Sequence, residues 1–89
     1  MKDLQELFRL MSSADYKDRF LAEYIQLNER VNALNKMLKG YREGTLNFTP
    51  SCSYDVLHTQ SVAMMLYLEV LKERARVENI TLPGVEQNG

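Results

Sequence analysis

The chain has 89 residues, and its eleven basic and twelve acidic side chains leave a net charge of −1. A domain of this size has a modest core, so disulfides, metal ions or partner subunits commonly add to its stability. Cys52 is the only cysteine and His58 the only histidine, which excludes an intrachain disulfide and argues against a metal site or other cofactor. The balanced charge argues against a nucleic-acid partner. A homo-oligomer is therefore expected.

The most apolar stretch is VAMMLYLEVL, residues 62–71, which carries a single charge at Glu69. It has about half of the roughly 20 residues that a membrane-spanning helix needs. The N-terminal MKDLQELFRL carries charges through the region where a signal peptide is apolar. We expect a cytoplasmic protein that does not contact a membrane.

Apolar residues recur every three or four positions along most of the chain, which predicts an all-α protein. A first helix is expected over about residues 3–11, capped by Asp3. Its apolar stripe is formed by Leu4, Leu7, Phe8 and Met11. A second and longest helix is expected over residues 14–43, capped by Ser12 or Ser13 and ending at Gly44 or, one turn earlier, at Gly40. Its stripe is formed by Tyr16, Phe20, Tyr24, Leu27, Val31, Leu34, Leu38 and Tyr41.

The segment TLNFTPSCS cannot continue this helix, because Pro50 lacks an amide hydrogen and restricts the residue before it. A third helix is expected over residues 53–80, capped by Ser51 or Ser53. Its stripe is formed by Tyr54, Leu57, Ser61, Met64, Leu68, Leu71 and Ala75, and Ile80 and Leu82 close its end. Residues 1–82 thus form a single helical domain, a short helix followed by a long antiparallel hairpin, and residues 83–89 form a flexible tail.

The third helix is apolar on more than the one face that a hairpin partner covers. The additional apolar positions are Val62, Met65, Leu66 and Val70. The short first helix has few apolar side chains and is expected to cover only part of them. A second copy of the chain is expected to cover the rest, so these four residues are the predicted oligomer interface.

Cys52 and His58 are the one pair that would suggest nucleophilic catalysis, because a helix N-terminus can activate a thiol. Their separation by six residues at one helix start is poor geometry for a hydrogen bond, and no third residue stands out to orient the histidine. No glycine-rich phosphate loop or metal motif occurs. We therefore expect Cys52 to be a buried small residue beside a partly exposed imidazole, with no catalytic residues and no enzyme activity.

Aromatic and basic residues alternate early in the second helix, which is a composition that suits a nucleotide, since rings stack on bases and cations bind phosphate. These residues are Tyr16, Lys17, Arg19, Phe20 and Tyr24. The alternative is that the rings belong to the core and the cations to the solvated surface. In the loop, Phe48 either plugs the end of the hairpin or presents a ring, with Thr49 and Ser51, beside a helix N-terminus. The candidate ligand-binding residues are Lys17, Arg19, Tyr24, Phe48, Thr49 and Ser51.

Three segments resemble a family of small proteins from bacteriophages and prophages of gut and Firmicutes bacteria, known by their relation to a crAss-like phage protein. The segments are DYKDRFLAEYIQLNERVNALNKML, LNFTPSCSYDVLHTQ and MLYLEVLKERARVENITL, which lie between Asp15 and Leu82. That family's loop usually has Asp where this chain has Asn47 and Pro where it has Ser53. Serine caps a helix better than proline, so the helix start is kept. The resemblance implies a phage origin, and hence that the protein is located in the cytoplasm of a bacterial host.

LNERVNALNKML followed by LHTQSVAMMLYLEVL is similar in layout to the helical hairpin of phage anti-CBASS and anti-Thoeris sponge proteins, which oligomerise and sequester cyclic nucleotide signals. This similarity implies a non-enzymatic helical oligomer that acts against bacterial defence by sequestering such a signal. Two alternatives stay open, because a fold alone does not define a function. One is an inhibitor that binds a host defence protein, as anti-CRISPR proteins do, and the other is a structural or assembly accessory of the phage.

Overall fold

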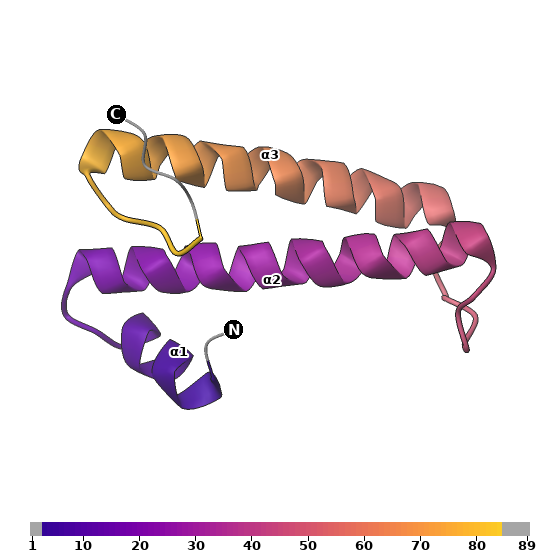
Figure 1. The fold of residues 1–89 in the computed structure, drawn as a ribbon, viewed down its shortest axis with the longest axis horizontal. Helices are drawn as coiled ribbons and strands as arrows, with labels where there is room; N and C mark the ends of the chain where they lie inside the picture. Colours follow the sequence, from indigo (N-terminus) through magenta and orange to yellow (C-terminus); the bar gives the residue numbers. More distant parts are fainter. Residues whose placement is uncertain (1–2, 85–89) are drawn as a thin grey trace.

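The computed structural model describes residues 3–84, which form three α-helices and no strand. These are α1 (Leu4–Met11), α2 (Tyr16–Glu43) and α3 (Tyr54–Glu78). Figure 1 shows α2 and α3 as an antiparallel hairpin, with α1 on the side of α2 that faces away from α3. The predicted fold class, a short helix followed by a long helical hairpin, is confirmed. No helix in the described part of the chain is long and apolar enough to cross a membrane.

Side-chain caps define the helix starts. Asp3 caps α1 by accepting from the amide of Glu6 at 2.8 Å. The cap of α2 is Asp15, which accepts from the amide of Lys17 at 2.9 Å, and not Ser12 or Ser13 as the sequence predicted. Ser13 instead accepts from the amide of Asp15 and so stabilises the turn that precedes the cap. Capping satisfies amides that have no partner within the first turn of a helix.

The loop between the long helices runs from Gly44 to Ser53. Gly44 ends α2 in the left-handed region, with φ of 71°, which glycine adopts without the steric cost that a Cβ imposes. Ser53 begins α3 by accepting from the amide of Val56 at 3.2 Å. The loop therefore turns sharply, and the end of α2 lies beside the start of α3.

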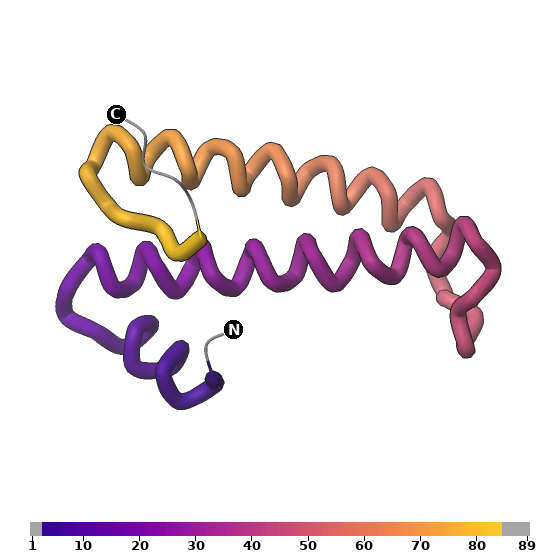
Figure 2. Tube along the Cα trace, viewed as in Figure 1, coloured from indigo at the N-terminus to yellow at the C-terminus, as the bar shows by residue number. Residues whose placement is uncertain are grey.

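The core lies along the seam between α2 and α3. Leu71 and Ala75 are completely buried there, and Phe20 faces them from α2 with 2% of its surface exposed. The segment after α3 turns back between the two helices, as the trace in Figure 2 shows. Ile80 and Leu82 are buried in this segment, so they close the end of the hairpin as predicted. The predicted tail, residues 83–89, lies outside the described residues from residue 85 onward.

The face that α1 buries differs from the predicted one. Leu4, Phe8 and Met11 are exposed, whereas Leu10 is buried and Leu7 is partly buried against α2. α1 has only about two turns, and its apolar residues lie on more than one face. The angle at which α1 docks on α2 therefore decides which face is buried. The expectation that this helix covers part of α3 is also wrong, because α1 packs on α2.

Candidate functional site

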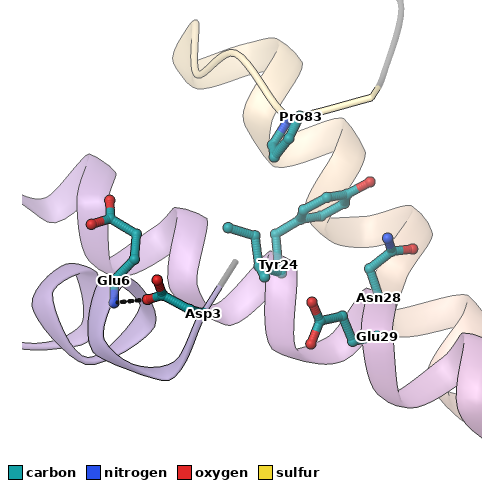
Figure 3. A pocket seen from close by; sticks show the side chains of 7 residues that line it. Asp3, Glu6, Tyr24, Asn28, Glu29 and Pro83 are labelled. Atoms are coloured by element: carbon teal, nitrogen blue, oxygen red, sulfur yellow. Dashed lines mark hydrogen bonds between the residues drawn. The ribbon is translucent and has the colours of Figure 1, made fainter. Parts of the chain in front are cut away.

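One hollow, of about 530 Å³, lies between α1, α2 and the segment after α3. It is lined by Asp3, Glu6, Tyr24, Ile25, Asn28, Glu29 and Pro83, as Figure 3 shows. Three of these side chains are carboxylates, and none of the described lining residues is basic. Asp3 already caps α1, and Glu6 accepts from the guanidinium of Arg9 at 2.7 Å. Carboxylates repel phosphate, so this hollow does not suit the phosphates of a nucleotide.

The aromatic and basic residues early in α2 have different environments. Tyr24 is 3% exposed, so neither face of its ring is open to a base in this arrangement. Arg19 donates to the carbonyl oxygen of Ser13 at 2.8 Å, while Lys17 is exposed on the first turn of α2. The rings of Phe20 and Tyr24 therefore belong to the core, whereas Tyr16 is 44% exposed and does not.

Arg74 of α3 reaches across to the start of α2. Its guanidinium lies 5.0 Å from the ring centroid of Phe20 and donates to the hydroxyl of Tyr16 at 2.6 Å. It also donates to the carboxylate of Glu78 at 3.4 Å. The hydrogen bond to Tyr16 raises the pKa of Arg74 above its usual value, and Glu78 adds to that effect. Arg74 therefore joins α3 to α2, and its guanidinium already donates to Tyr16 and Glu78.

A second group of rings and a cation lies at the loop end of the hairpin. The guanidinium of Arg42 donates to the hydroxyl of Tyr54 at 2.7 Å and lies 6.0 Å from that ring's centroid. Tyr41 meets Tyr54 edge-on, with centroids 5.5 Å apart. His58 stacks on Tyr54 at 5.7 Å, with an interplanar angle of 15°. Three rings and one guanidinium thus converge where α2 ends and α3 begins.

A smaller hollow of about 190 Å³ adjoins these rings and is lined by Gly40, Tyr41, Gly44, Leu46, Phe48, Thr49 and Pro50. A Cβ at Gly40 would lie 2.9 Å from Cδ2 of Leu46, so the absence of a side chain lets the loop approach α2. Phe48 is 54% exposed, which leaves part of its ring open to a ligand. None of the described lining residues is acidic. We call Tyr41, Arg42, Phe48, Tyr54 and His58 the loop-end cluster.

The comparison with known families decides how this hairpin is classified. Residues 14–77 match the family model named Sequestin. The chain belongs to the Sequestin family. No curated protein and no solved structure matches it.

The residues matched by the Sequestin family model include the whole loop-end cluster but only part of the lining of the acidic hollow. It spans α2, the loop and nearly all of α3, so it contains every residue of the loop-end cluster. It leaves out Asp3, Glu6 and Pro83, which are three of the residues that line the acidic hollow. The loop-end cluster is therefore the candidate site that belongs to the Sequestin part of the chain.

The six ligand-binding residues predicted from the sequence fall at opposite ends of this hairpin. Lys17, Arg19 and Tyr24 lie near the start of α2, whose 28 residues span about 42 Å. Phe48 and Thr49 line the hollow beyond its other end, and Ser51 is exposed further along the same loop. One chain therefore brings Phe48 and Thr49 together but does not bring them to Lys17.

The ligand-binding residues predicted from the sequence do not include Tyr41, Arg42, Tyr54 or His58. Tyr54 and His58 are four residues apart, which places them on one face of a helix, and this signal was present in the sequence. Their meeting with Arg42 follows from the antiparallel pairing of the helices, which has no local signature.

Cys52 and His58 are positioned differently in this Sequestin chain. Cys52 is exposed, and the ring of His58 stacks on Tyr54. The expectation that Cys52 is a buried small residue is wrong, since the loop holds it on the surface. Among residues 3–84, no group of three or more His, Cys, Asp or Glu side chains could hold a metal ion.

Proposed function

We propose that this protein is a phage-encoded, non-enzymatic binding protein that sequesters a cyclic nucleotide signal of bacterial defence in the host cytoplasm. Membership of the Sequestin family over nearly the whole hairpin carries the proposal, because the family's name denotes sequestration. The ligand classes are cyclic di- and trinucleotides and cyclic ADP-ribose derivatives. Sequestration needs only reversible binding, so no catalytic group is required.

The chemistry of the loop-end cluster supports this choice of ligand. A nucleotide is held by rings that stack on its base and by cations that bind its phosphate. The exposed ring of Phe48 and the guanidinium of Arg42 provide one group of each kind at the same end of the hairpin. Arg42 is exposed and its guanidinium has five donors, so it can keep its bond to Tyr54 and still bind a phosphate.

The experiment is a set of melting curves measured with a panel of these nucleotides. A ligand that binds only the native state stabilises it by about 2.7 kcal/mol at a hundredfold excess over Kd. For a domain of this size the midpoint rises by roughly 10–20 °C. The ligand recovered after denaturation should have an unchanged mass, since no reaction is proposed. A panel in which no nucleotide moves the midpoint would overturn the proposal, and a recovered ligand that is cleaved would overturn its non-enzymatic part.

Matched variants locate the site. Arg42→Met and Phe48→Ala should each reduce the ligand-induced shift, while Lys17→Met, at the other end of the same helix, should leave it unchanged. All three residues are exposed, so the ligand-free midpoint should change little. If Lys17→Met or Arg19→Met removes the shift and Arg42→Met does not, the ligand binds at the start of α2.

A second candidate function is inhibition of a host defence protein by direct binding. The exposed apolar residues of α1, which are Leu4, Phe8 and Met11, favour it, because exposed apolar patches mark protein-binding surfaces. This function predicts that pull-down from host lysate recovers one stoichiometric protein and that no nucleotide shifts the melting midpoint. A negative result in both assays would favour a structural or assembly accessory of the phage.

A further inference from the structure

The loop hollow, which Gly40 and Phe48 line, is smaller than a pocket that encloses a whole nucleotide. Its volume of about 190 Å³ lies below the roughly 300–1,000 Å³ of pockets that bury a drug-sized ligand. A cyclic dinucleotide is at least of drug size, so only a part of it can enter. The base is the part that suits an enclosed space with apolar walls, because it is flat and its faces carry no charge. The hollow therefore has room for one base, while sugar and phosphate stay outside.

Apolar side chains of the loop provide surfaces for the faces of a base. The ring of Phe48 is 54% exposed, and Leu46 and Pro50, which are partly buried, also line the hollow. Every base has a face that stacks on an aromatic ring, so such contacts tolerate any base. They bind a base without distinguishing one base from another.

The end of α2 gives the hollow a preference for an amino group over a phosphate. Gly40, Tyr41 and Gly44 line the hollow where α2 ends. The carbonyl oxygens of a helix point toward this end, which is the negative end of its dipole. Among residues 3–84, no backbone amide donates to the carbonyls of Arg42 or Glu43. Such oxygens repel an anion and accept a hydrogen bond from the exocyclic amino group of a base.

Arg42 is placed to hold a phosphate outside the hollow. Its guanidinium donates to the hydroxyl of Tyr54, and Arg42 is not one of the described residues that line the hollow. Tyr41 connects the two places, since it lines the hollow and meets Tyr54 edge-on. A guanidinium beside the negative end of a helix dipole offsets the repulsion that a phosphate would otherwise meet there. Base and phosphate therefore have separate partners.

We infer that the loop hollow binds one amino-bearing base of the sequestered nucleotide (adenine, cytosine or guanine) and that Arg42 binds the adjoining phosphate outside it. This inference rests on the proposed function and states which part of the ligand is recognised. The recognised unit is a single nucleotide, and the rest of a cyclic ligand is not required for binding. The inference concerns one chain and does not depend on the predicted oligomer interface, whose four residues are exposed: Val62, Met65, Leu66 and Val70.

Adenosine 5′-monophosphate is the probe, because it contains only the recognised unit. In an NMR titration of the isotope-labelled protein, it should shift the amide signals of residues 44–50 and leave those of residues 16–24 unchanged. Purine ribonucleoside 5′-monophosphate has the same shape without the amino group. It should bind roughly fivefold more weakly, because one hydrogen bond is lost. Equal affinity of the two probes, or shifts confined to residues 16–24, would overturn the inference.

Variants separate the partner of the phosphate from the partners of the base. Arg42→Met should weaken binding of adenosine 5′-monophosphate about tenfold and leave that of adenosine, which has no phosphate, within about twofold. Phe48→Ala should weaken both ligands, since it removes a stacking surface. Lys17→Met, at the other end of α2, is the matched control and should weaken neither. If Arg42→Met weakens adenosine as much as its monophosphate, Arg42 does not bind the phosphate and the inference is wrong.

Gly40→Ala changes the hollow without removing a ring or a charge. The added Cβ would lie 2.9 Å from Cδ2 of Leu46, so the side chain of Leu46 must move, and both residues line the hollow. The variant should weaken adenosine and its monophosphate by the same factor, with circular dichroism as the check that it is folded. Unchanged affinity for both ligands would show that the base does not enter the hollow.

The titration and the melting curves together separate this inference from the proposed function. If a cyclic nucleotide raises the melting midpoint but adenosine 5′-monophosphate does not bind at millimolar concentration, the inference is overturned and the proposed function stands. If the monophosphate binds at the loop end and no cyclic nucleotide raises the midpoint, the proposed function is overturned and the hollow remains a site for a base. If neither ligand binds, both are overturned.

Discussion

Aromatic residues of this chain have different environments that their identities do not reveal. Phe20 is buried against Arg74, whereas Phe48 has an exposed ring at the edge of the loop hollow. Tyr24 is buried, while Tyr54 forms the centre of the loop-end cluster. Only a ring with an open face can stack on a base. Phe48 at the loop end therefore has a ring available to a ligand, as does Tyr16, which is 44% exposed at the start of α2.

Cys52 provides a test at the level of a single residue. It is exposed in the loop, and the ring of His58 is stacked on Tyr54. Because the proposed function requires no nucleophile, Cys52→Ser should leave ligand binding, and protection of the phage against host defence, within a few-fold of the wild type. Binding is measured by the melting shift and protection by plating efficiency. A loss of several orders of magnitude in a variant that is still folded would indicate nucleophilic catalysis.

The pairing of the two long helices includes a polar contact in the middle of the seam. The hydroxyl of Ser61, which is buried, donates to the side-chain oxygen of Asn35 on α2. A buried polar pair is satisfied only when the two helices are in the correct register. The contact therefore favours this alignment of α2 with α3 over one displaced by a turn.

Ser61→Ala should lower the free energy of unfolding by about 1 kcal/mol, because Asn35 loses a buried hydrogen bond. Thr59→Ala is the matched control, since Thr59 is exposed and its hydroxyl bonds only to the carbonyl of Asp55 in its own helix. Urea denaturation of both variants measures the difference. Equal effects of the two substitutions would show that the polar contact does not stabilise the hairpin.

At the scale of the whole molecule, α1 is attached to the hairpin by a narrow apolar contact. Leu10 is buried against α2 and Leu7 is partly buried, whereas Leu4 on the same helix is exposed. Two exposed polar contacts add little: Arg9 lies 4.0 Å from Asp18, and the side-chain amide of Gln26 donates to the sulfur of Met11 at 3.3 Å. The burial of Leu10 therefore accounts for most of the docking of α1.

Leu10→Ala should destabilise the protein by about 2–5 kcal/mol, the usual cost of removing a buried leucine side chain. Leu4→Ala, the same substitution at an exposed position of α1, should have almost no effect. Hydrogen exchange at the amides of α1 and thermal unfolding both report the difference. If the two variants lose the same stability, α1 is not held by Leu10.

The sequence by itself determined the elements, because helical period, capping residues and the break at Pro50 are local properties of the chain. It therefore predicted two long helices, a short one, and the seams that join α2 to α3. Phe48 and Thr49, which line the loop hollow, were also predicted as ligand-binding residues from the sequence, since they lie in the segment that Pro50 keeps from being helical.

Only the tertiary structure decided which faces meet. It placed α1 on α2, buried Leu10 and left Leu4 exposed, because the docking angle of a short helix depends on the shape of its partner. It also brought Arg42 to Tyr54 from another helix and separated Lys17 from Phe48. Contacts between distant segments follow from the packing of whole helices, and no local pattern of residues encodes them.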